Sequence, residues 1–335
     1  MTPGADKAHA GLLLALGFAA FAVALASLFV GYVHIDVFTA ARDALAGRDS
    51  IEALALVQLR LPRAILGASI GFTLGLSGAA MQGLLRNPLA DPGVIGVSGG
   101  AAFGAVAAFY TGLSAAFALA LPLGGVAGAI LSALALYGLA GRGAGTTTLI
   151  LAGVAINSFT GALTSLALNL SPNPYAVFEI MFWLMGSLAD RSLPQVALAL
   201  PLMVVGWIAM LSSARALDAL TLGEDTAESL GFDLRRLRWK LVAGSALAVG
   251  ASVAVAGAIG FVGLVVPHLL RPWVGHRPGR LLLASGFGGA LALVVADLGV
   301  RVLPLQPELK LGVLTALVGA PFLLALVFRA RRDEP

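Results

Sequence analysis

The sequence predicts an all-α polytopic membrane protein with about ten transmembrane helices. Hydrophobic residues make up 59% of the 335 positions, charged residues make up 11%, and the mean hydropathy is +0.95. A soluble domain typically has about a quarter of its residues charged, so this composition excludes an ordinary water-soluble globule. The apolar residues also form long uninterrupted runs, as transmembrane helices require.

These runs place ten crossings along the chain. The first run is too long for the apolar core of a signal peptide and is expected to be a retained span. At about 20 residues per crossing, Pro92–Gly141 holds two spans. The runs that hold one span each are Ala10–Val33, Ala64–Leu85, Gly143–Phe178, Ser192–Ala214, Leu281–Ala296 and Leu311–Phe328.

The remaining run, Leu241–Leu270, is flanked by basic residues at both ends. The positive-inside rule places both flanks in the cytoplasm, yet at about 1.5 Å per residue the run is too short for two full spans. We therefore expect one full crossing and a shortened return. Its helix is expected to be broken at Gly257, Gly260, Gly263 and Pro267.

The basic residues predict the orientation. If the outer segments are roughly 34–63, 110–117, 171–191, 256–264 and 301–310, the remaining segments carry 14 of the 21 Lys and Arg residues. The positive-inside rule then places those segments and both termini in the cytoplasm. Because this topology accounts for the net charge of +4, it does not indicate a nucleic-acid partner.

Residues 1–335 form a single transmembrane domain in this interpretation, with one large cytoplasmic loop at 215–240. That loop holds ten of the chain's 38 charged residues, arranged as a short amphipathic helix, a stop at Gly231 and a basic run. Such a loop is where a protein otherwise embedded in lipid can bind a soluble partner.

Two short motifs lie outside the apolar runs. Leu59–Arg63, at the start of the second span, fits either a helix N-terminus with arginines reaching the headgroups or a docking site for an acidic external partner. Arg86–Gly93 predicts a rigid turn that serves as a connector or a gate. Asn87 and Asp91 of this turn are candidate caps for the next helix.

Two further motifs lie within or beside the spans. Small and hydroxyl residues recur through Gly143–Leu170, and Asn157 and Ser158 among them suit either helix packing in lipid or a pathway for a bulky polar solute. Asp297 and Arg301 are one helical turn apart, which predicts an ion pair near the outer boundary.

Missing motifs exclude several functions. The chain has no G-x-x-x-x-G-K-[ST] phosphate loop, no H-E-x-x-H zinc motif and no cysteine, and its four histidines lie far apart. The spans also lack the buried acids and bases of a proton-driven carrier. Energy for transport is therefore expected to come from outside the chain. The alternatives are a self-contained secondary transporter or channel for a small polar solute, and an intramembrane enzyme.

Several ordered blocks resemble one known family. They are residues 59–106, LILAGVAIN at 149–157, FWLMGSLAD at 182–190, LGEDTAESLGFD at 222–233, residues 256–271 and residues 307–326. Together they resemble the FecCD family, the permease subunits of ABC importers for iron-siderophores, haem and vitamin B12. The resemblance extends from about residue 55 to residue 328.

The resemblance implies a vitamin B12 permease-like subunit in the bacterial inner membrane. Its partners would be a second copy of itself, two ABC ATPase subunits that bind ATP and Mg, and a periplasmic substrate-binding protein. The chain itself would be a transport subunit rather than an enzyme, with no cofactor, metal or catalytic residue of its own.

The resemblance also implies roles for individual residues. The ATPase-coupling residues would be Leu222, Gly223, Glu224, Ala227, Leu230 and Gly231. The residues that dock the binding protein would be Arg60, Arg63 and Arg301. The gate regions would contain Asn87, Leu89, Thr146 and Thr147, and we add Asn157 and Ser158 as candidates for the translocation path.

Overall fold

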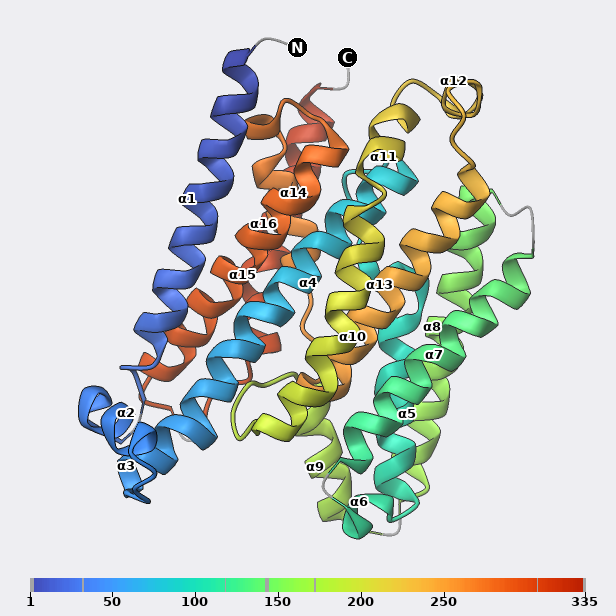
Figure 1. Cartoon of the computed structure of the whole chain (residues 1–335). Helices are drawn as coiled ribbons and strands as arrows, with labels where there is room; N and C mark the ends of the chain where they lie inside the picture. The colour runs from blue at the N-terminus through green and yellow to red at the C-terminus, as the bar shows by residue number, and fades with distance from the viewer. Residues whose placement is uncertain are drawn as a thin grey trace.

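The computed structural model describes residues 3–31, 33–117, 119–141, 145–171, 173–305 and 307–333. Every regular element within these ranges is a helix, and the described residues contain no strand (Figure 1). The all-α prediction is therefore confirmed.

Seven helices in the described ranges are long and apolar enough to cross a membrane. They are α1 (Pro3–Ser27), α4 (Leu61–Leu85), α7 (Ala120–Ala140), α8 (Thr146–Asn169), α10 (Leu193–Leu211), α13 (Leu234–Ala256) and α15 (Pro278–Val302). The other predicted crossings contain α5 (Val97–Tyr110), α14 (Val262–Leu270) and α16 (Leu311–Asp333). Each of the ten predicted segments thus contains a helix, but α5 and α14 are shorter than a full span.

The break between α13 and α14 lies at Gly257 and Gly260 as predicted, but the breaks predicted at Gly263 and Pro267 are wrong, because both residues lie within α14. Gly257 ends α13 with φ of 74°, and Phe261 begins α14 with φ of 68°. A Cβ atom at Gly257 would lie 2.2 Å from the carbonyl oxygen of Trp183, so only glycine allows this approach. The expected long helix followed by a short one, the nine-residue α14, is present.

The second span begins earlier than predicted. The Ser50 hydroxyl caps α3 (Ile51–Leu54) by accepting a 3.2 Å hydrogen bond from Ala53 N. A π-helical turn, η1 (Ala55–Arg60), then joins α3 to α4 as one helical stretch. The expectation that the helix starts near Pro62 is therefore wrong, because the helical stretch begins at Ile51. Pro62 lies just after the π-helical turn, where the hydrogen-bond register changes.

Short helices occupy the segments between the spans. Those at the outer end in the predicted topology are α2 (Val37–Leu45), α3, α6 (Leu113–Ala116) and α9 (Pro174–Leu184). Those at the opposite end are α11 (Ala214–Leu220), α12 (Glu224–Ser229) and the 3-10 turns η2 (Pro92–Ile95) and η3 (Pro272–Val274). Both termini lie at the end that carries α12 (Figure 1).

Close contacts between small residues bring α4 against α15 and α14. A Cβ atom at Gly75 would lie 1.9 Å from the Ser285 carbonyl oxygen on α15, and one at Gly78 would lie 1.8 Å from the Gly263 oxygen on α14. Helix association in lipid depends on such packing, because lipid tails provide no hydrophobic force between helices. These glycines set how closely the three helices approach.

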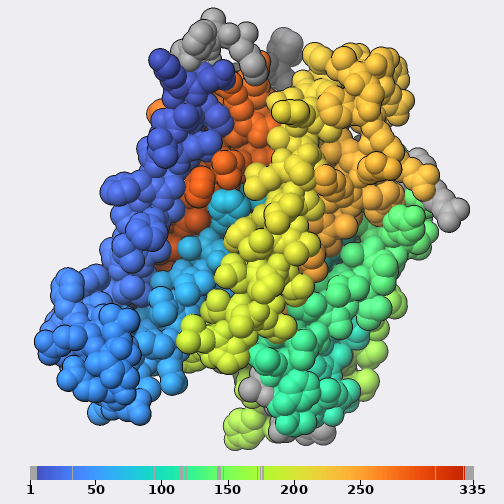
Figure 2. All heavy atoms as spheres, in the orientation of Figure 1, coloured from blue at the N-terminus to red at the C-terminus, as the bar shows by residue number. Residues whose placement is uncertain are grey.

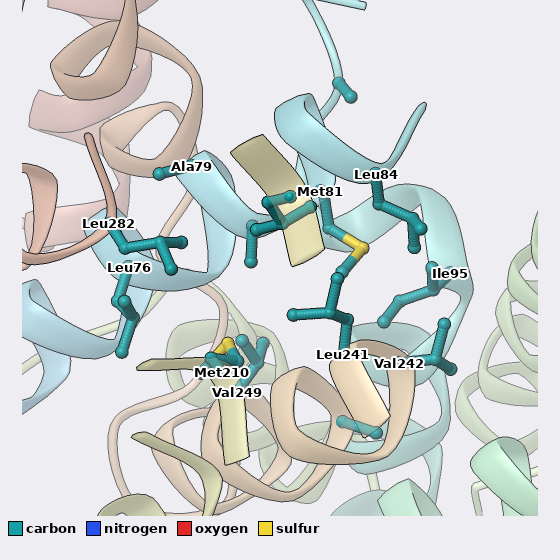
Figure 3. Close-up of a cluster of buried hydrophobic side chains, with 14 of the residues drawn as sticks. Leu76, Ala79, Met81, Leu84, Ile95, Met210, Leu241, Val242, Val249 and Leu282 are labelled. Carbon is teal, nitrogen blue, oxygen red and sulfur yellow. The ribbon is translucent and has the colours of Figure 1, made fainter. Parts of the chain in front are cut away.

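The largest buried cluster joins α4 to α13. Met81 and Leu84 of α4 point toward Leu241 of α13, with Ile95 of η2 beside them (Figure 3). On the outside, α10 lies diagonally across α4 and α13 (Figure 2). The core is therefore continuous from the membrane helices to the end that carries α11 and α12.

Candidate functional site

The segment predicted to bind the ATPase is a protrusion formed by α11 and α12, at the upper right of Figure 2. Two glycines with positive φ bracket α12, Gly223 at 108° and Gly231 at 87°. Between them, Ala227 is fully buried in the main core cluster. The six predicted coupling residues thus lie together, but Ala227 faces the core rather than a partner.

The outer surface of the protrusion combines leucines with acidic side chains. Leu222 is 66% exposed and Leu230 is 59% exposed. Glu224, Asp225 and Glu228 are also exposed around them. This pattern, a small apolar contact with a charged rim, is common on protein-binding surfaces.

The protrusion is attached to two membrane helices. Glu224 accepts a 2.7 Å hydrogen bond from Arg238 Nη2 on α13. Asp218 accepts a 2.8 Å hydrogen bond from the backbone N–H of Gly279 in the first turn of α15. The protrusion is therefore bonded to both α13 and α15.

At the other end of the bundle, Arg63 binds two carboxylates. Its Nε and Nη2 donate to Asp297 over distances of 2.8 to 3.1 Å, and its Nη1 donates to Glu308 Oε2 at 3.2 Å. Nη2 also contacts Glu308 Oε1. Asp297 is 2% exposed at its side chain and Glu308 is 17% exposed.

Arg60 and Arg301 bind the chain that follows α1. Arg60 Nη1 donates to Leu28 O at 2.6 Å, and its Nη2 donates to Val33 O. Arg301 Nη1 donates to Ser27 O at 2.9 Å. Arg301 also forms the predicted i,i+4 ion pair with Asp297.

The three predicted docking arginines therefore lie in one cluster, but each is already bonded within the chain. Arg60 is 8% exposed and Arg301 is 7% exposed, whereas the Arg63 side chain is 12% exposed. Glu308 was not among the predicted site residues. Sequence reasoning missed it because its partner lies 245 residues away, although it stands within the family block at 307–326.

The predicted gate turn follows α4. Arg86 ends α4 with φ of 50°, and Asn87 Oδ1 then accepts a 2.9 Å hydrogen bond from Leu89 N. Leu89 is 42% exposed. Asp91 caps η2 as expected, because its Oδ1 accepts a 2.8 Å hydrogen bond from Gly93 N. Asn87, the other candidate cap, instead accepts its hydrogen bond within the turn that follows α4.

Helix α8 carries the other candidate pathway residues. Thr147, Asn157 and Ser158 are exposed, and α8 contains no charged residue. Thr146 begins α8, but its side chain lies outside the described residues. Asn157 Oδ1 lies against α5, where a Cβ atom at Gly99 would be 2.4 Å away.

The gate turn and α8 are in contact. Gly96, which follows η2, has φ of 76°, and a Cβ atom there would lie 2.7 Å from the Gly153 carbonyl oxygen of α8. The gate turn thus approaches α8 through η2, at Gly153 rather than at Thr146 or Thr147. Among the described residues, no group of three or more His, Asp and Glu residues is arranged to hold a metal ion.

Comparison with known proteins gives a consistent result. The model of the FecCD transport family matches residues 19–329. The chain is 42% identical over 271 residues to the cobalamin import system permease protein BtuC of Halobacterium salinarum, covering 80% of this chain and 72% of that protein. It is also 42% identical over 304 residues to the vitamin B12 import system permease protein BtuC of Vibrio cholerae, covering 90% and 89%.

Two further matches cover nearly the full length. An uncharacterized ABC transporter permease protein, YvrB of Bacillus subtilis, is 36% identical over 340 residues, with 98% of this chain and 96% of that protein covered. A solved structure of a metal-chelate type ABC transporter in an inward-facing conformation matches with a TM-score of 0.83 and 30% identity. That match covers 96% of this chain and 99% of the solved chain.

Proposed function

The chain belongs to the FecCD transport family and is the transmembrane permease subunit of an ABC importer, and on this premise we propose that it imports a cobalamin-type metal chelate. The main support for this cargo is the 42% identity to the vitamin B12 permease of Vibrio cholerae over 90% of this chain. Haem and iron-siderophores are the competing cargoes. We place the chain in the bacterial inner membrane, with loop 215–240 and both termini in the cytoplasm.

The energy is supplied by a separate ATPase subunit, because this chain lacks a phosphate-binding loop. Two copies of the permease and two ATPases, which bind ATP and Mg, form the transporter. Leu222 and Leu230 provide the apolar contact with the ATPase, and the acidic rim around them orients it. Closure of the ATPases then pulls on α13 through Glu224 and on α15 through Asp218.

The binding protein docks over Arg60, Arg63 and Arg301, with Arg63 as the residue most open to exchange. Its bonds to Asp297 are buried, whereas its bonds to Glu308 lie at a carboxylate that is 17% exposed. A carboxylate of the binding protein can therefore take the place of Glu308 while Asp297 stays in position. Arginine suits this exchange because its planar fork binds two oxygens at once.

The path for the cargo lies between the two permease copies. The exposed face of α8 presents Thr147 and Ser158 beside large apolar residues such as Phe159, which is 66% exposed. A face that is partly polar and carries no charge binds a bulky solute weakly, which favours release. Asn87 and Leu89 form the gate at the cytoplasmic end of this path.

Reconstitution tests both the cargo and the energy source. The permease, its ATPase and its binding protein are placed in liposomes, and uptake of cobalamin, haem and a ferric siderophore is compared with and without ATP. We expect ATP-dependent uptake of cobalamin above the other two. Preferred uptake of haem or a siderophore would contradict cobalamin as the cargo but would agree with an ATP-driven importer. ATP-independent uptake by the permease alone would support a self-contained carrier.

A further inference from the structure

A second basic site lies at the end of the bundle that carries α12, away from the outer arginine cluster. It is a cavity of about 200 Å³ between the end of α4, the end of α14 and the start of α15. Arg86, Arg271 and His276 line it together with Gln82, Thr221 and Pro278. None of the described residues that line it is Asp or Glu.

The cavity contains a guanidinium group that has no counterion among the described residues. Arg271 Nη2 donates a 2.5 Å hydrogen bond to Gln82 Oε1, but its Nε is buried and has no hydrogen-bond partner. Within the described ranges, neither Arg271 nor Arg86 forms an ion pair. At the outer end the same chain pairs Arg63 with carboxylates. A half-buried arginine without an acid is stabilised by an anion from elsewhere.

Arg271 is held in position before any ligand arrives. Gln82 is buried, and its Nε2 donates to Gly263 O at 3.4 Å and to Leu264 O at 3.3 Å, so its Oε1 is fixed toward Arg271. Arg86 and His276 both have positive φ, 50° and 59°. Non-glycine residues adopt this conformation at an energetic cost, which is commonly found at binding sites.

The surroundings of the cavity indicate the level of the lipid headgroups. Trp273, between Arg271 and His276 in the sequence, is 74% exposed, and Leu269 before them is 54% exposed. Tryptophan beside basic residues is typical of the membrane–water interface. Basic pockets between transmembrane helices on the cytoplasmic side bind the phosphates of anionic lipids.

We propose that this cavity binds a phosphate group, carried by the headgroup of an anionic lipid in the cytoplasmic leaflet. Arg86 and Arg271 bind the phosphate oxygens, and His276, in the same turn as Arg271, adds a third donor. The bound lipid would tie the end of α4, which leads into the gate turn, to the start of α15, which holds the coupling protrusion through Asp218. The site does not depend on which cargo is transported.

Lipid titration of the delipidated chain, followed by native mass spectrometry, tests the proposal. The probes are phosphatidylglycerol, phosphatidylcholine and inorganic phosphate. We expect one tightly held phosphatidylglycerol per chain and no equivalent phosphatidylcholine. Arg86→Gln and Arg271→Gln should each raise the Kd for phosphatidylglycerol about fivefold, since one arginine near the membrane surface contributes on the order of 1 kcal/mol.

The control is Arg235→Gln, which removes the same charge from an exposed residue of α13 at the same end of the bundle. Arg86→Gln is the decisive variant, because the Arg86 side chain is exposed whereas Arg271 also holds Gln82. Equal Kd values for the Arg86→Gln and Arg235→Gln variants would overturn the site.

The remaining outcomes identify the ligand. If inorganic phosphate binds alone and is lost in Arg86→Gln, the phosphate site is correct but the lipid is not its source. If phosphatidylglycerol binding is unchanged in Arg86→Gln while association with the ATPase is lost, the cavity contacts the ATPase and the proposal is overturned.

Discussion

Arg63 on α4 and Asp297 on α15 are joined by three hydrogen bonds of 2.8 to 3.1 Å across 234 residues of sequence. Asp297 also pairs with Arg301, so one carboxylate neutralises two arginines. Arg301 in turn donates a hydrogen bond to the carbonyl oxygen of Ser27 at the end of α1. Asp297 therefore connects α15 to α4 directly, and to the end of α1 through Arg301.

Asp297→Asn is expected to destabilise the protein strongly. The substitution keeps the shape of the side chain but leaves Arg63 and Arg301 with only Glu308 as a counterion. Removing one partner of a buried ion pair costs about 3–5 kcal/mol. The free energy of unfolding in detergent micelles measures this loss. Asp49→Asn, at an exposed position in the outer segment, should change it by less than about 0.5 kcal/mol, and equal losses would contradict the role of Asp297.

Glu308→Gln is expected to strengthen docking of the binding protein, because it removes the more accessible of the two carboxylates that bind Arg63. We expect the Kd of docking to fall about tenfold, which corresponds to ~1.4 kcal/mol, and Arg63→Gln to raise it. Surface plasmon resonance with the permease in nanodiscs measures both. Glu179→Gln removes an exposed carboxylate from α9 and controls for net charge. A similar gain in that control would mean that general electrostatics, rather than exchange at Arg63, governs docking.

Leu230→Ser is expected to weaken ATPase binding without affecting the fold. Leu230 is 59% exposed, so polar substitution removes little buried area from the permease itself. We expect co-purification of the ATPase to fall about tenfold, as for a central contact residue worth more than about 1 kcal/mol. Leu45→Ser, at a 91% exposed leucine in the outer segment, is the matched control. Full retention of the ATPase by Leu230→Ser would remove this leucine from the interface.

Gly75→Ala is expected to separate α4 from α15. The added methyl group would lie 1.9 Å from the Ser285 carbonyl oxygen, a distance that requires the backbones to move apart. Overpacking of this kind typically costs about 1–3 kcal/mol or more, and the melting temperature should fall. Gly11→Ala in α1, with no atom within 4 Å of the added group, should not lower it. If both variants melt alike, the close approach of α4 and α15 is not a source of stability.

Local patterns predicted the parts of the fold that local interactions decide. The length of the apolar runs predicts the spans, and the glycines after Ala256 predict the break before α14, because glycine alone accepts the backbone conformation at Gly257. The i,i+4 spacing of Asp297 and Arg301 likewise predicts their ion pair.

The missed features depend on contacts between distant segments or on short helices. Glu308 binds Arg63 only because the fold brings α4 beside the segment before α16. The 11-residue α9 is too short to be predicted as a span, and it lies within the predicted outer segment 171–191. The helical start at Ser50 was missed because the charged residues of segment 34–63 resemble a loop.

The nine residues of α14 have a consequence for how the protein is made. They extend about 14 Å as a helix, less than half of the hydrocarbon thickness of about 30 Å. A segment this short cannot span the hydrocarbon by itself, so we expect it to enter the membrane as a hairpin with α13. Its lasting position requires α4, already inserted, and α15, still to be translated, to enclose it. Helix α14 is therefore fully enclosed in the bilayer only after residues 278–302 of α15 have been synthesised.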